Sequence, residues 1–172
     1  MGMSRRIVTF AAVALLALSL GGDRAWAKVT KGDRAVELSS VKDRKNRSIR
    51  LRAYRGKVVV LTFGASWCKP CRKELPTYEK LAKKYKKAGK PVVFIAVNID
   101  SERKNADRFI KEVGLATVVV GYDPKGAAVE KYEPPTMPST YVIDAKGIVR
   151  AVHAGFESGD DKKIKKLVDS LL

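Results

Sequence analysis

The sequence predicts an α/β protein, a sandwich in which helices flank a central mixed β-sheet, preceded by an N-terminal β-hairpin. The first observation is two apolar, β-rich runs, Lys57–Phe63 and Val92–Ile99, which are typical of strands buried on both faces. The second is a helical pattern after each run. The third is a pair of strand patterns near the C-terminus, joined by the turn sequence Asp144–Gly147 and followed by a last helix.

The predicted hairpin precedes the first buried strand. Ala35–Leu38 and Ser48–Leu51 alternate apolar and polar residues, and Asp43–Asn46 between them has the composition of a turn. We therefore expect these two segments to form the arms of the hairpin.

The remaining elements follow from helical spacing and from the residues that end helices. Pro70–Lys87 repeats apolar residues every three or four positions, and Gly89 and Pro91 end that helix. We expect Ser101 to cap a second helix. The other expected elements are that helix to Val113, a strand over Thr117–Tyr122, a short helical turn over Gly126–Tyr132, strands over Thr140–Ile143 and Ile148–Val152, and a last helix from Asp160 or Asp161.

The N-terminus has the pattern of a secretory signal peptide. Arg5 and Arg6 precede the apolar run Ile7–Leu20, and Ala25–Ala27 supplies small residues for cleavage. The run has 14 residues, fewer than the roughly 20 that span a bilayer. We expect a signal peptide over 1–27, one domain over 28–172, and a periplasmic or otherwise extracytoplasmic location. An uncleaved membrane-anchored form is the alternative.

The net charge is strongly positive but does not indicate a nucleic-acid partner. The whole chain carries +17, and residues 28–172 keep 32 basic and 17 acidic residues, or +15. Many lysines are scattered along predicted helix faces, without a nucleic-acid recognition motif. Solvated helix faces are the simpler interpretation, so no nucleic acid is expected to bind.

The chemistry is predicted to reside in the two cysteines, Cys68 and Cys71, between a buried strand and the start of a helix. Helix N-termini favour negative charge, and the thiolate is the attacking form of a cysteine. Cys71 lies one turn further on, within reach of a mixed disulfide at Cys68. A structural disulfide is the alternative, but so short a loop stabilises little. Zinc needs about four ligands, and the chain offers two cysteines and one histidine.

Two segments carry a resemblance to a known family. Phe63–Pro76, which contains Trp67-Cys68-Lys69-Pro70-Cys71, resembles the active-site segment of the thioredoxin superfamily, and in particular of the exported TlpA/ResA-like thiol–disulfide oxidoreductases. Thr136–Asp144, followed by Gly147 and Ile148, is similar to the family segment that holds a cis-proline facing the cysteines. The resemblance extends from about Lys31 to the C-terminus and implies a thioredoxin-like fold.

The resemblance also implies roles for individual residues. Cys68 would be the nucleophile and Cys71 the resolving thiol of a redox-active disulfide. Pro138 would be the cis-proline, the Met137 backbone would hydrogen-bond a substrate chain, and Trp67 would pack beside the site. For Trp67 the alternative is core filling, and for Pro138 an ordinary trans proline.

Glu74 is the third catalytic candidate. It lies three residues after Cys71, and in the TlpA/ResA-like branch a glutamate here lies near the cysteines. A carboxylate close to the thiols could exchange protons with them. The alternative is an exposed helix acid paired with a lysine. Thioredoxin itself has a buried aspartate six positions before its first cysteine, where this sequence has Thr62, so Glu74 is the expected substitute.

Three other functions share this fold. A copper chaperone would use Cys68, Cys71 and His153, although such proteins usually place three residues between the cysteines and this one has two. A peroxidase would need proline and threonine spacing before its reactive cysteine, which is missing. A non-catalytic binding module would usually have lost one cysteine.

The resemblance favours a reductant of protein disulfides, although the dipeptide Lys69-Pro70 does not settle the direction. The implied clients have cysteine pairs, such as apocytochrome c or a copper-site protein of a respiratory oxidase. Electrons would come from a membrane thiol-transfer protein. We expect a monomer without a cofactor or metal.

Overall fold

The computed structural model describes residues 28–172, so the expected signal peptide lies outside the described residues. Their six strands form one sheet in the order β1-β4-β3-β2-β5-β6. The β2–β3 and β3–β4 pairs are parallel, and the other three pairs are antiparallel. The strands are β1 Lys42–Asp43, β2 Val58–Gly64, β3 Val92–Asn98, β4 Val119–Tyr122, β5 Ser139–Ile143 and β6 Val149–Ala154.

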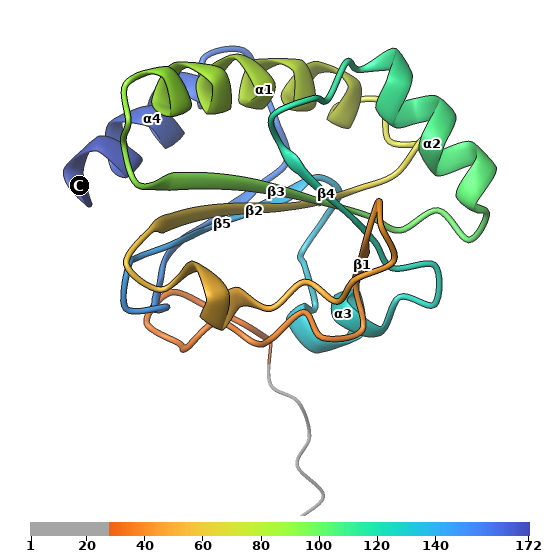
Figure 1. Ribbon diagram of the computed structural model, residues 1–172, viewed down its shortest axis with the longest axis horizontal. Helices are drawn as coiled ribbons and strands as arrows, with labels where there is room; N and C mark the ends of the chain where they lie inside the picture. The colour runs from red at the N-terminus through yellow and green to blue at the C-terminus, as the bar shows by residue number, and fades with distance from the viewer. Residues whose placement is uncertain (1–27) are drawn as a thin grey trace, which may run out of the picture.

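Helices cover both faces of the sheet (Figure 1). One face carries α1 Cys71–Lys87, α2 Arg103–Glu112 and α4 Asp160–Ser170. The other carries α3 Ala127–Tyr132 and the N-terminal segment, which includes the 3-10 turn η1 Leu51–Tyr54. The predicted mixed α/β sandwich is confirmed, and the active-site segment joins the central strand β2 to α1.

Alternation along β2 produces two hydrophobic cores, one on each face. Val58 and Val60 point toward α1, α2 and α4, whereas Val59, Leu61 and Phe63 point toward α3. Every residue of β2 is buried, as the continuous apolar run predicts. Thr62 is the polar exception. It faces α1 because side chains alternate along a strand and Thr62 lies two residues after Val60.

The N-terminal segment differs in detail from the expected hairpin. The turn at Asp43–Asn46 is present, and Lys42 bridges Ser48 across it. Ala35–Leu38 is not a strand, because residues near its start bond elsewhere: the Ala35 N–H donates to the Gly147 carbonyl at 3.0 Å. The second arm turns into η1, whose first N–H groups, those of Leu51 and Arg52, donate to the Glu37 carboxylate.

The start of α2 also differs from the expectation. The residue at the N-cap is Glu102, with extended backbone and no capping side-chain hydrogen bond, so the prediction that Ser101 caps this helix is wrong. The other helices and strands lie within a few residues of the expected bounds. Among residues 28–172, no helix has both the length and the apolar character needed to cross a membrane.

Candidate active site

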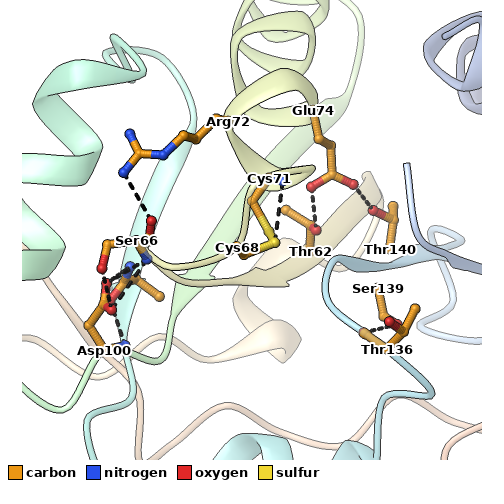
Figure 2. Close-up of a disulfide and its surroundings, with 11 residues drawn as sticks. Thr62, Ser66, Cys68, Cys71, Arg72, Glu74, Asp100, Thr136, Ser139 and Thr140 are labelled. Carbon is orange, nitrogen blue, oxygen red and sulfur yellow. Dashed lines mark hydrogen bonds between the residues drawn. A yellow bond between two sulfur atoms is a disulfide. The ribbon is translucent and has the colours of Figure 1, made fainter. Parts of the chain in front are cut away.

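The two cysteines lie where the central strand passes into α1. Cys68 and Cys71 form a disulfide with Cα atoms 5.3 Å apart, and both side chains are buried. Cys71 opens α1, and its N–H lies 3.3 Å from Cys68 Sγ (Figure 2). Once the pair is reduced, this donor and the helix dipole stabilise a thiolate at Cys68.

Gly64, the last residue of β2, lies so close to the cysteine pair that a side chain does not fit there. A Cβ atom on Gly64 would lie 2.9 Å from Cys71 Sγ, a distance that real Cβ contacts essentially never show. Gly64 therefore lets the strand pass directly under the second cysteine, which is the close backbone approach that favours glycine.

The loop before Cys68 is held by Asp100, a residue that the sequence analysis did not single out. Its buried carboxylate accepts the Ser66 N–H at 2.9 Å and the Ser66 hydroxyl at 2.8 Å, and it also accepts the Asn98 side-chain amide (Figure 2). On the other side of the loop, Arg72 donates to the Ser66 carbonyl and pairs with Glu112. The sequence did contain a signal, since Asp100 follows the second buried strand and the carboxyl ends of parallel strands meet at one edge.

Glu74 is fully buried beneath α1, so it is not an exposed helix acid. Its Oε2 accepts the Thr62 hydroxyl at 2.9 Å, and its Oε1 accepts the Thr140 hydroxyl at 2.7 Å (Figure 2). Burial raises the pKa of Glu74 to about 7, although the hydroxyls of Thr140 and Thr62 oppose the shift. A carboxyl with a pKa near neutrality can both give and take a proton under physiological conditions.

The three residues expected to contact clients lie around the pair. Trp67 is 63% exposed, which excludes core filling for this residue. Met137 packs against the cluster that contains both cysteines, and the Met137–Pro138 peptide bond is cis. Figure 2 shows the 136–139 segment on the opposite side of the disulfide from Asp100.

His153 is not among the groups gathered at the cysteines. It lies on β6, and its Nε2 is 2.9 Å from a carboxylate oxygen of Asp160 at the start of α4. In the part of the chain that the structure describes, no group of three or more His, Cys, Asp or Glu side chains is placed to hold a metal ion.

A cysteine pair between the central strand of this mixed sheet and the start of the following helix defines a thioredoxin-like thiol–disulfide oxidoreductase. The sequence profile of the AhpC/TSA family matches residues 32–152, and the chain belongs to that family.

Individual relatives agree with this class. The thiol-disulfide oxidoreductase ResA of Geobacillus thermodenitrificans is 31% identical over 177 aligned positions, which cover 99% of each chain. The thioredoxin-like protein YneN of Bacillus subtilis is 36% identical over 129 positions, covering 74% of this chain and 73% of YneN. Among solved structures, a putative thiol:disulfide interchange protein DsbE from Chlorobium tepidum has a TM-score of 0.76 and 32% identity, and the match covers 84% of this chain and 99% of that one.

Proposed function

We propose that this thiol–disulfide oxidoreductase is an exported reductant of protein disulfides, with Cys68 as the attacking thiol and Cys71 as the resolving thiol. The observation that carries the proposal is the Cys68–Cys71 disulfide at the start of α1. The assignment of roles is supported by the hydrogen bond between the Cys71 N–H and Cys68 Sγ, because this donor favours the thiolate at the first cysteine.

The proposed reaction starts from the reduced pair. The Cys68 thiolate attacks one sulfur of a client disulfide, which breaks the client S–S bond and releases the other client sulfur as a thiolate. Cys71, as its thiolate, then attacks Cys68 Sγ, releases the second client sulfur and leaves the Cys68–Cys71 disulfide. The client gains two electrons, two protons convert its thiolates to thiols, and a dithiol donor must later reduce the enzyme.

Glu74 is the proposed proton-exchanging group in this cycle. With a pKa near 7, its carboxylate takes the proton of Cys71 as that thiol becomes the nucleophile, and its acid form returns the proton on reduction. In this proposal the exposed Trp67 and the Met137–Pro138 turn contact the client chain, the Met137 backbone through β-like hydrogen bonds.

The proposed location and partners rest on the N-terminal pattern and on the relatives. Arg5 and Arg6, the apolar run and Ala25–Ala27 support export, cleavage after Ala27 and a mature domain over 28–172. The reductive direction is supported by the resemblance of Phe63–Pro76 to the TlpA/ResA-like branch, and the relatives named thiol-disulfide oxidoreductase ResA agree with that branch. The proposed clients are cysteine pairs such as those of apocytochrome c or of a copper-site protein, and the proposed donor is a membrane thiol-transfer protein.

The copper alternative is not favoured by the position of His153. Its Nε2 lies beside Asp160, whereas the cysteines are bonded to each other. Copper(I) titration of the reduced protein, with His153→Ala as the control, separates the two functions. Tight binding that is lost in His153→Ala would establish the chaperone instead.

Single cysteine variants test the proposed roles. We expect Cys68→Ser to abolish insulin reduction, and Cys71→Ser to accumulate a mixed disulfide with a client that carries a cysteine pair. Mass spectrometry of non-reduced samples identifies the adduct and the sulfur that forms it. Equal residual activity in the two variants, or an adduct at Cys71 in Cys68→Ser alone, would reverse or refute the assignment.

A further inference from the structure

The carboxylate of Glu74 is held by two threonines that lie side by side on adjacent strands of the sheet. Thr62 on β2 and Thr140 on β5 are direct partners in the antiparallel ladder, so their side chains emerge on the same face. Glu74 reaches down from α1 and presents one oxygen to each hydroxyl, at 2.9 and 2.7 Å. All three side chains are buried, so water does not substitute freely for either hydroxyl.

The two hydroxyls are not equivalent, because Thr140 has a second partner. The Tyr78 hydroxyl donates to Thr140 Oγ1 at 3.1 Å, which orients the Thr140 proton toward Glu74 Oε1. Thr62 has no comparable donor behind it among the hydrogen bonds of the described residues. Thr140 is therefore held as a donor, whereas the Thr62 hydroxyl can turn and accept.

We propose that Thr62 and Thr140 are positioning residues that hold Glu74 for proton exchange, with the proton carried on Oε2, the oxygen that faces Thr62. This inference rests on the proposed function of Glu74. Oε2 is the oxygen on the β2 side, and β2 is the strand whose Gly64 lies directly under Cys71. Thr140 lies on β5, two residues after Pro138. The Thr140 hydroxyl therefore fixes the Glu74 carboxyl group relative to the segment proposed to contact clients.

The physical effect of the pair is to favour the ionised form of Glu74. A carboxylate accepts both hydroxyl protons, but a carboxylic acid has to donate its own proton and forces one hydroxyl to turn. Burial acts in the opposite direction and raises the pKa, so the balance of the two effects sets where Glu74 titrates. If one hydroxyl is removed, less remains to counter the effect of burial, so the pKa of Glu74 rises.

Other titratable groups that face Glu74 are few. Tyr78 lies on the same helix, and Asp160 at the start of α4 adds a negative charge that raises the pKa of Glu74 further. Asp160 is itself paired with His153 on β6 and with Lys163. The thiols of the cysteine pair add to this set when the disulfide is reduced. His153 is the single histidine of the sequence and is paired with Asp160, so the pH profile needs a control variant at this position.

The test is the pH dependence of disulfide reduction by the full protein between pH 5 and 9, in Thr62→Val and Thr140→Val. Valine keeps the shape and removes only the hydroxyl. We expect the midpoint assigned to Glu74 to rise by about one pH unit in each variant, since hydrogen bonds to a charged group are worth about this much. Thr62→Ser and Thr140→Ser keep the hydroxyl and should restore the midpoint.

Three controls sharpen the result. Thr77→Val removes a hydroxyl on α1 that bonds the Glu74 carbonyl rather than its carboxylate, and it should leave the midpoint unchanged. His153→Gln removes the single histidine of the sequence, and the midpoint assigned to Glu74 should persist in this variant. Tyr78→Phe removes the donor behind Thr140, a hydroxyl that also acts directly on the Glu74 carboxylate and lowers its pKa, so the midpoint should rise in this variant as well. This variant still tests the inference if a valine variant fails to fold.

The outcomes separate this inference from the proposed function. Active valine variants with an unchanged midpoint would overturn the positioning role and leave the cysteine chemistry intact. If the midpoint moves in Thr77→Val as much as in the other valine variants, the shift comes from a general disturbance of α1, and the positioning role is refuted. Retention of activity in Cys68→Ser would instead refute the proposed function itself.

Discussion

Glu74→Gln should change the pH dependence of folding stability, because the buried acid titrates differently in the folded and unfolded chains. The pKa is about 7 in the folded protein and 4.5 for an ordinary glutamate. Between these values the unfolded chain releases the proton while the folded protein keeps it, so this group's contribution to stability falls as pH rises. At 1.36 kcal/mol for each pKa unit, the loss approaches about 3 kcal/mol by pH 8.

The variant lacks this titration. We therefore expect the stability of Glu74→Gln relative to wild type to increase by about 3 kcal/mol between pH 4.5 and pH 8. Urea unfolding of the oxidised proteins at several pH values measures the difference. A difference that stays constant within about 1 kcal/mol would refute the burial argument for Glu74.

Glu79→Gln is the matched control on the same helix. Burial opposes ionisation of Glu79 as well, but the N–H groups of Val118 and Thr117 outweigh it and lower the pKa. A lowered pKa stabilises the folded protein above the unfolded value, so the stability of this variant relative to wild type should decrease as pH rises through 4.5. The two variants are thus expected to show opposite signs.

Three further substitutions test the surroundings of the site. Asp100→Ala leaves the Ser66 N–H without its acceptor, so we expect a loss of about 1–3 kcal/mol in urea unfolding; an unchanged stability would show that the carboxylate does not hold the loop. Trp67→Ala removes an exposed side chain and should change stability by less than about 0.5 kcal/mol while raising KM for protein clients, but not for small disulfides; equal effects on both substrates would argue against client contact. Glu37→Ala unpairs the first N–H groups of η1 and should cost about 1–2 kcal/mol with activity per folded molecule retained.

The sequence predicted those parts of the fold that depend on hydrophobic periodicity. The continuous run before Cys68 identified the central strand, because a strand covered on both faces has few polar positions. The N-terminal arms were less predictable. Ala35–Leu38 alternates apolar and polar residues like a strand. The backbone at residues 32–35, however, hydrogen-bonds residues 147–149, more than a hundred positions later in the chain. The local sequence pattern cannot reveal so distant a pairing.

The candidate site was predictable in its residues and not in its connections. The spacing placed Cys71 and Glu74 one turn apart on the helix that starts just after Cys68. The hydrogen-bond partner of Glu74, Thr140, lies sixty-six residues later in the chain, and the spacing gives no sign of it. Thr62 was recognised only as the residue that stands where thioredoxin has its buried aspartate, whereas the structure makes it a hydrogen-bond donor to Glu74. Asp100 was missed because its role depends on two parallel strands ending side by side.

The measurement that tests the central claim most directly is the reduction potential of the Cys68–Cys71 couple, determined in dithiothreitol or glutathione buffers at pH 7. The account of this protein as a reductant predicts a value near or below the roughly −270 mV typical of thioredoxin. A value close to roughly −120 mV, typical of a strong oxidant, would contradict the proposed direction of electron flow and the clients that depend on it.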